Sequence, residues 1–214
     1  MSADEQQELS RRERERRWRR SLILEAAEEL FSTRGYHATS VQQIAEQAEF
    51  SVGFLYNMFE NKEDIYHRLA DWRWEEYHGQ IRKGMEEAQD EVEAIRALVT
   101  AKLEFFREHR QFFDIFVNLC AVSPERRPPP LSSEWIERYL EYQSELEDVF
   151  RSGVERGVFA DLDPAAAVVT VEGVTNAIIR RWSRPVEEER ELIGAETIER
   201  ILFNGLLAEG QHHE

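Results

Sequence analysis

The chain has 214 residues, of which 42% are hydrophobic and 33% charged, a composition typical of a globular protein with a sizeable core. It has no apolar run of the roughly 20 residues that a membrane helix needs, no apolar secretory segment at its start, and one cysteine, Cys120, so an internal disulfide is excluded. We therefore expect a cytoplasmic protein with no membrane partner. The net charge is −16, but residues 10–20 (SRRERERRWRR) carry seven arginines against two glutamates.

Three short helices are predicted near the N-terminus. The first runs from residue 11 or 19 to Arg34 with an apolar stripe at i, i+4 and i+8, and Gly35 ends it as a C′ glycine. The second follows a cap at Thr39 or Ser40, and the third follows a cap at Ser51. Two helices joined by such a tight turn form a helix-turn-helix, whose second helix lies in the DNA major groove.

The remainder of the chain is also predicted to be helical. Asn61 and Asp90 are expected to cap two helices, the prolines of residues 128–130 require a loop, Gly157 ends a helix, and Asp163 caps another. Six longer helices are expected, over about 62–88, 91–107, 110–121, 132–156, 164–184 and 188–209. The sequence thus predicts an all-α chain of nine helices, with no strand pattern.

The run LILEAAEELFSTRGYHATSVQQIAEQAEFSVGFLYNMFENKEDI, at residues 22–65, resembles the DNA-binding segment of the TetR family. The matching landmarks are Ala26-Ala27, Leu30-Phe31, Gly35-Tyr36, Thr39-Ser40, Ile44-Ala45, Ala48, Ser51, Gly53, Leu55-Tyr56, Phe59 and Asn61-Lys62. The resemblance implies an N-terminal three-helix DNA-binding domain with a helix-turn-helix, followed by a C-terminal six-helix ligand-binding and dimerisation bundle. We place an Arg-rich arm at 1–20, the DNA-binding domain at 18–64 and the bundle at 65–214.

The resemblance also implies which side chains face DNA. These are Thr39, Ser40, Gln42, Val52, Gly53, Phe54, Tyr56, Asn57 and Lys62. Tyr56, Thr39 and Lys62 are expected to hold phosphates, whereas Asn57 and Gln42 have amides that pair with base edges. Val52 and Phe54 are expected to pack on thymine methyl groups, with an inward, core position as the alternative for Phe54. Gly53 lets the backbone approach DNA closely.

Two positions depart from the family pattern. The turn residue that is usually glycine is Glu49, and the residue after Asn57, usually histidine or aromatic, is Met58. A non-glycine residue with left-handed backbone costs about 1 kcal/mol or more, unless the turn adopts another shape.

The resemblance implies an effector pocket among the fourth to seventh helices and a dimer interface on the last two. Candidate pocket residues are Trp72, Phe105, His109, Phe113, Phe116, Asn118, Trp135 and Tyr139; the alternative for each is ordinary core packing. Candidate interface residues are Val169, Gly173, Asn176, Ala177, Ile198, Leu202 and Gly205. Gly173 lies inside a helix, where glycine usually has a packing reason.

These features predict a ligand-responsive transcriptional regulator, not an enzyme, that needs no cofactor or metal. As a homodimer it would repress from a palindromic double-stranded DNA operator, and a small apolar effector molecule would release it. A helical protein-interaction module without sequence-specific DNA binding is one alternative. A helical-bundle metalloenzyme is another, since Glu75-x-x-His78 is one part of a carboxylate di-iron motif, although a second such pair is lacking. The Arg-rich arm either contacts DNA or is a solvated helix start.

Overall fold

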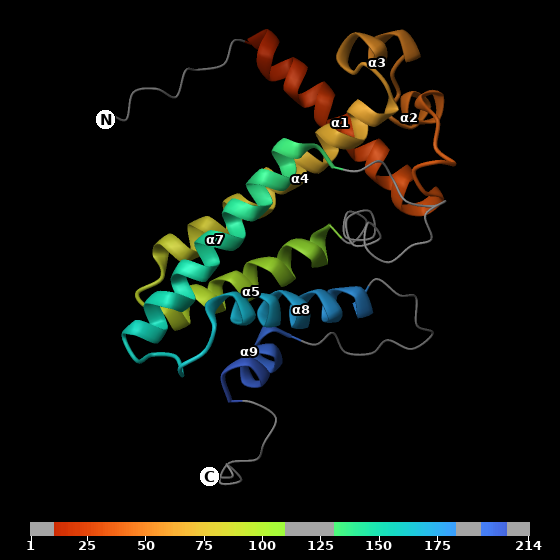
Figure 1. Ribbon diagram of the computed structural model, residues 1–214. Helices are drawn as coiled ribbons and strands as arrows, with labels where there is room; N and C mark the ends of the chain where they lie inside the picture. Colours follow the sequence, from red (N-terminus) through yellow and green to blue (C-terminus); the bar gives the residue numbers. More distant parts are fainter. Residues whose placement is uncertain (1–10, 110–130, 183–193, 205–214) are drawn as a thin grey trace.

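A computed structural model describes residues 11–109, 131–182 and 194–204, and every regular element within these ranges is an α-helix (Figure 1). The helices are α1 (Arg11–Arg34), α2 (Val41–Gln47), α3 (Val52–Met58), α4 (Lys62–Glu87), α5 (Glu91–Glu108), α7 (Ser133–Glu155), α8 (Pro164–Trp182) and α9 (Ala195–Asn204). The all-α prediction is confirmed for these residues. The helix expected over 110–121 lies outside them, as do Phe113, Phe116, Asn118 and Gly205.

Side-chain caps fix where most helices begin. Ser40 and Gln43 form a reciprocal capping box at α2: the Gln43 backbone N–H donates to Ser40 Oγ at 3.2 Å, and the Ser40 backbone N–H donates to Gln43 Oε1 at 2.9 Å. The other capping residues accept a backbone N–H at the starts of α3, α4, α5 and α7: Ser51, Asn61, Asp90 and Ser132. Each of these caps satisfies a donor that the helix itself leaves unpaired, and their positions agree with the helix starts predicted from the sequence.

Left-handed backbone ends two helices and forms one turn. Gly35 (φ +84°) follows α1 and Gly157 (φ +71°) follows α7, both as predicted. Glu49 has φ +59°, so the turn between α2 and α3 keeps its left-handed shape although the residue is not glycine. The sequence left open whether Glu49 would adopt the costly left-handed backbone or the turn would adopt another shape. The structure has the left-handed backbone.

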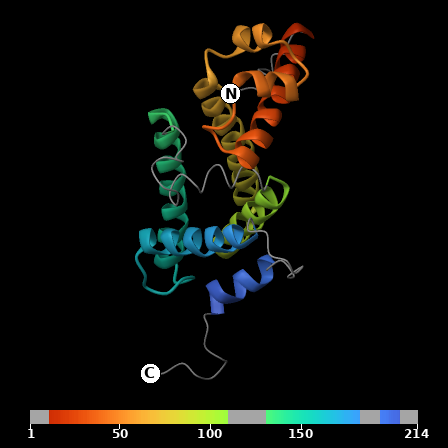
Figure 2. The ribbon, with the colours of Figure 1, turned by 90° about the vertical axis from the view of Figure 1, so that its right-hand side faces the viewer.

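Two hydrophobic cores meet along α4, which runs from the N-terminal helices α1–α3 into the bundle (Figure 2). The N-terminal core joins α1, α2 and α3 to Ile65, Tyr66 and Leu69 of α4. The second core joins Trp74 and Tyr77, further along α4, to α5, α7, α8 and α9. A single continuous helix therefore contributes to both cores. A movement of α4 within the bundle would be transmitted directly to α1–α3, which pack on the same helix.

Candidate DNA-reading surface and effector site

The α3 helix has one face in the N-terminal core and one face open to solvent. Leu55 is fully buried and Phe59, which ends the helix, is nearly so. On the opposite side Tyr56 is 52% exposed and Asn57 is also exposed. Gly53 is exposed too, and a Cβ atom added there would meet nothing within 4 Å. The structure thus presents a hydroxyl, an amide and open backbone on one short helix, a set suited to a DNA groove.

Phe54 and Val52 lie at the rim of the core. Both are half-buried, and the Phe54 ring stacks on Phe50 with a centroid distance of 5.0 Å. The Arg19 guanidinium lies 5.6 Å from the Phe54 ring centre. The Phe54 side chain is therefore neither fully buried in the core nor fully exposed. Its contact with Phe50 helps to orient α3, and the ring also lines the outer edge of that helix.

In and before α2 the polar candidates differ in accessibility. Gln42 is exposed, whereas Ser40 is half-buried and its hydroxyl serves the capping box. Thr39 is only 2% exposed, and its hydroxyl lies within hydrogen-bond distance of the Leu30 and Gly35 carbonyls (3.2 and 2.9 Å). The expected phosphate contact of Thr39 is therefore wrong: a side chain this buried, with its one hydroxyl proton already used, ties the α1–α2 loop to α1.

Lys62 also has a bracing role. Its ammonium donates to the Tyr36 and Thr39 carbonyls, both at 2.8 Å, and lies 4.3 Å from the Tyr36 ring centre. Burial lowers the pKa of Lys62. Two of its three N–H donors are committed to the loop before α2, so at most one is available to a phosphate.

A buried ion pair that the sequence analysis missed joins α1 to α4. The Arg73 guanidinium donates to Glu28 Oε2 from two nitrogens, at 2.6 and 3.0 Å, and both side chains are nearly inaccessible. Arg73 also donates to Glu76 at 2.7 Å, and Glu76 lies 3.4 Å from His109 Nε2 at the end of α5. A chain of polar contacts thus runs from α1 through α4 to α5.

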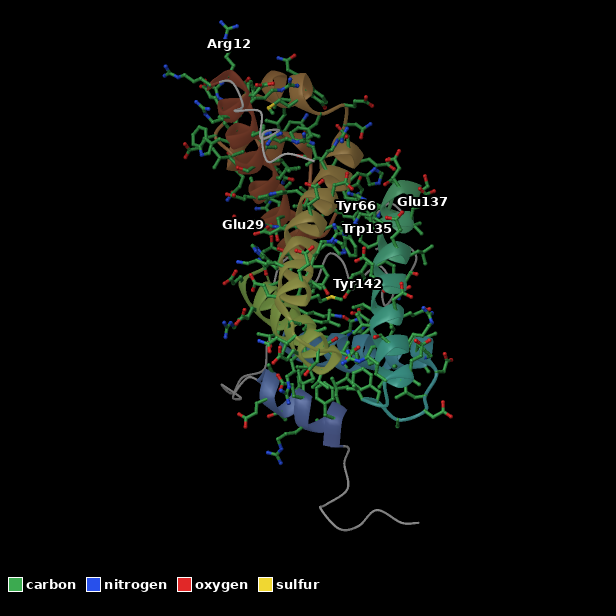
Figure 3. The ribbon with its side chains drawn as sticks, turned by 90° about the vertical axis from the view of Figure 1, so that its left-hand side faces the viewer. Arg12, Glu29, Tyr66, Trp135, Glu137 and Tyr142 are labelled. Atoms are coloured by element: carbon green, nitrogen blue, oxygen red, sulfur yellow. The ribbon has the colours of Figure 1, made fainter. Side chains whose placement is uncertain are left out.

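Aromatic rings fill the space between α4, α5 and α7. Trp135 is buried at 5.1 Å from the Trp74 ring and stacks on Tyr139, and Phe105 lies against Tyr77 (Figure 3 labels Trp135). Trp72, another pocket candidate, packs instead on the N-terminal core and under the Arg73 guanidinium. Trp135, Tyr139, Phe105 and the half-buried His109 therefore share one region, and Trp72 is separate from it.

Polar groups are buried in the same bundle. Lys102 Nζ lies 2.7 Å from Glu172 Oε2, and the Tyr142 hydroxyl donates to Glu172 Oε1 at 3.1 Å (Figure 3 labels Tyr142). Burial lowers the pKa of Lys102, and the Glu172 carboxylate opposes that shift; burial raises the pKa of Tyr142 well above its ordinary value. These groups link α5, α7 and α8 and provide polar anchors among the aromatic rings.

A cleft of about 420 Å³ opens between α4 and α7, close to these rings. It is lined by His78, Ile81, Arg82, Met85, Glu86 and Glu145. His78 stacks on Trp74 and lies 3.5 Å from Glu145. Its pKa is lowered by burial and by Arg82, against the opposing carboxylate. Within the described ranges no group of three or more His, Cys, Asp or Glu side chains is placed to hold a metal ion.

The α8 helix has an exposed face that is uncharged from Val169 to Ala177 and ends at the exposed Arg180 and Arg181. Val169 is 66% exposed, Gly173 and Ala177 are exposed one and two turns further on, and Asn176 is half-buried. Leu202 of α9 is half-buried against the bundle core. Ile198 is fully buried inside its own protomer, so its expected place in a dimer interface is wrong. No helix in the described ranges is long and apolar enough to span a membrane.

A helix-turn-helix with an exposed second helix, joined by one long helix to an aromatic-rich bundle, defines a DNA-binding regulator. Residues 23–69 match the family model for bacterial regulatory proteins of the tetR family, and residues 88–206 match that for the tetracyclin repressor-like C-terminal domain. The second match alone covers more than half of the chain. The protein belongs to the tetR family of transcriptional regulators.

Known proteins are similar to this chain over most of its length. The transcriptional repressor KstR2 of Mycobacterium tuberculosis is 28% identical over 172 residues, which cover 78% of this chain and 82% of KstR2. The structure of the TetR family regulator PfmR from Thermus thermophilus is 30% identical with a TM-score of 0.71, covering 87% and 96% of the two chains. That of AibR in complex with isovaleryl coenzyme A and operator DNA is 22% identical with a TM-score of 0.68, covering 85% and 94%.

Proposed function

We propose that this protein is a homodimeric repressor that binds a palindromic DNA operator in the cytoplasm and leaves it when a small apolar effector binds the bundle. The DNA-binding domain comprises residues 18–64, after an arm at 1–20, and the effector and dimerisation domain comprises 65–214. The observation that carries the proposal is the exposed Tyr56–Asn57 face of α3 on a helix-turn-helix whose α4 extends into the bundle.

In this proposal the side chains of α2 and α3 divide the work of DNA binding. Asn57 and Gln42 are exposed amides that pair with base edges, and adenine is their natural partner. Tyr56 donates to a phosphate and Gly53 allows close approach, while Val52 and Phe54 present apolar edges at the rim. Ser40, Thr39 and Lys62 hold α2 and its preceding loop in position.

The effector site is proposed between α4, α5 and α7, where the cleft lined by His78 and Glu145 opens beside the packed rings of Phe105, Trp135 and Tyr139. Tyr142 and His109 provide polar groups near these rings. AibR, which shares this fold, has been crystallised with an acyl-coenzyme A and with operator DNA together. An effector that binds the released state more tightly than the DNA-bound state moves α4, and α4 carries the change to α1–α3.

The first test is selection of the purified protein against a random duplex pool, with sequencing of the bound fragments. A palindrome with half-sites about 34–36 Å apart is expected from a two-fold dimer. Loss of all enrichment, also after refolding to strip a bound effector, would favour the helical protein-interaction module. For the effector, acyl thioesters, free fatty acids and neutral hydrophobic compounds are compared by thermal shift and by release of the selected duplex.

Replacement of Asn57 tests base reading. Asn57→Ala is expected to cost about 1–3 kcal/mol of discrimination on the selected duplex, because a bidentate amide–base contact has that value. Binding to a scrambled duplex of the same length is expected to be unchanged. Gln80→Ala, an exposed amide on the bundle part of α4, is the matched control. Equal losses on both duplexes would contradict a base contact.

A further inference from the structure

The helices that read DNA are short of positive charge. Residues 21–62 contain α2, α3 and the packed part of α1, and they hold two basic side chains, Arg34 and Lys62, against six acidic ones, a net charge of −4. Lys62 already donates to two backbone carbonyls, and Arg34 lies in the last turn of α1. Because duplex DNA carries about one negative charge per 1.7 Å, this unit alone would be repelled by it.

The start of α1 carries the opposite charge. Residues 11–20 hold seven arginines and two glutamates, a net charge of +5. They form two to three helical turns that extend beyond the N-terminal core, since the buried residues of α1 begin only at Ile23 and residues 11–18 are all exposed. Figure 3 shows Arg12 at the extreme end of the molecule, beyond the N-terminal core. Packing against the described part of the protein therefore does not explain residues 11–18.

Contacts with α3 fix the direction in which this extension faces. The Arg19 guanidinium lies 5.6 Å from the Phe54 ring centre on α3, and that of Arg20 lies 5.7 Å from the Phe59 ring centre at its end. Arg12 and Arg16 precede Arg20 by eight and four residues, so they continue the same helix face outward. We call Arg12, Arg16 and Arg20 the arginine row.

The outer members of the arginine row are available for binding. Arg12 and Arg16 are exposed, and among the described residues neither forms an ion pair. Arg20 is partly occupied, since the carboxylates of Asp64 and Asp71 act on it and its pKa is lowered mainly by burial. The guanidinium groups of Arg16 and Arg12 thus lie one and two helical turns along α1 from Arg20, which contacts the end of α3.

We infer that Arg12 and Arg16 form a second DNA contact, which binds phosphates flanking the half-site read by α3 and supplies the charge that α2 and α3 lack. This inference rests on the proposed function, because it places α3 in the groove. A guanidinium binds phosphate oxygens in a bidentate manner and independently of base sequence. The contact therefore adds affinity and salt dependence without adding specificity.

The test compares three double variants with equal charge changes. Arg12→Gln with Arg16→Gln removes the contact and keeps helix propensity. Arg14→Gln with Arg17→Gln removes the same charge from the opposite face of the same turns. Lys83→Gln with Arg151→Gln removes it from exposed bundle positions. Affinity for the selected duplex and for a scrambled duplex is measured over a fourfold range of salt, with circular dichroism as the check on folding.

The Arg12/Arg16 variant is expected to reduce the slope of log K against log salt by about 1.8 per protomer, since each phosphate contact contributes about 0.9. The loss of affinity is expected to be equal on the two duplexes, in contrast to Asn57→Ala. The Arg14/Arg17 variant is expected to change the slope by less than half as much, and the bundle variant to leave it unchanged.

A slope for the Arg12/Arg16 variant that equals that of the bundle variant would overturn the inference. If the wild-type protein instead enriches no sequence, the proposed function fails, and the scrambled duplex still shows whether the arginine row binds phosphates. The two failures are therefore distinguishable.

Discussion

Glu49 is a residue whose type does not suit its backbone conformation, because a left-handed backbone favours glycine. A non-glycine residue with φ near +60° costs about 1–2 kcal/mol because Cβ approaches the following carbonyl oxygen. The backbone bonds on either side are kept: the Glu49 N–H donates to the Glu46 carbonyl at 3.1 Å and that of Phe50 to Ala45 at 2.9 Å. The turn geometry is thus imposed by the packing of α2 on α3.

Glu49→Gly is expected to be more stable than Glu49→Ala by about 1 kcal/mol in urea unfolding. Both changes remove the carboxylate, but only glycine relieves the left-handed backbone. The alanine variant is therefore the control for charge, and both are expected to unfold with the same dependence on urea concentration. Equal stabilities for the two variants would mean that the strain is absorbed elsewhere.

The sequence could predict the exposed residues of α3 but not every side chain near them. The period of the helix distinguishes Leu55 from Tyr56 and Asn57 without a structure. Thr39 could not be placed in this way, because its burial depends on where the loop after α1 turns back against Leu30. Lys62 resembles a phosphate ligand in sequence, and only the path of the 36–39 backbone shows that carbonyls already bind it.

At the scale of helices, the caps were predictable because each involves residues within three positions of one another. The buried charges Glu28, Arg73, Lys102 and Glu172 gave a weaker signal: each falls on an apolar helix stripe, where a charged residue needs a partner. Periodicity marks such a residue but does not identify a partner 45 or 70 residues away. The pairing of helices had to come from the structure.

The Glu28–Arg73 pair is expected to determine how firmly α1 is held against α4. Arg73→Met leaves the Glu28 carboxylate buried without its partner, and a loss of about 3–5 kcal/mol in the free energy of unfolding is expected. The double variant Glu28→Leu with Arg73→Met is expected to recover most of that loss, because well-packed apolar residues replace buried ion pairs at little cost. Urea unfolding of both variants measures the difference.

The matched control for this prediction is Arg68→Met, which removes an exposed ion pair with Asp64 from the same helix. Its expected effect is below about 1 kcal/mol, since exposed pairs contribute little. If the double variant remained as unstable as Arg73→Met, the guanidinium would be needed for its contact with Glu76, and the pairing of α1 with α4 would depend on that contact as well as on Glu28.

Negative and positive charge lie at opposite ends of the protein. Residues 63–214 carry −14, whereas the start of α1 is basic. Two bundles in a dimer repel one another, while DNA attracts the arginine row. Added salt is therefore expected to have opposite effects, strengthening the dimer and weakening DNA binding. The unequal distribution of charge could be predicted from the sequence. The helix face that is available to join two bundles could not, because only the structure shows that Ile198 is buried within its own protomer.

Within the described residues, the exposed stretch of α8 from Val169 to Ala177 offers a surface without exposed charged side chains on which such a dimer can form. Val169 lies on this face with Gly173 and Ala177, and a glutamate at its position would be desolvated against the partner. Val169→Glu is expected to weaken dimerisation at least about tenfold, the loss that 1.4 kcal/mol gives, as measured by sedimentation equilibrium. Binding to the palindromic duplex is expected to fall with it, because one protomer reads only one half-site.

Leu140→Glu provides the comparison, because Leu140 is 56% exposed on α7 and the change adds the same charge. It is expected to leave the dimer intact. If both variants weakened the dimer equally, the effect would come from added negative charge and not from the α8 face. If Val169→Glu left the dimer dissociation constant unchanged, the two protomers would be held together by another surface. The spacing of the two DNA-binding domains, and so of the half-sites, would then be set by another pair of helices.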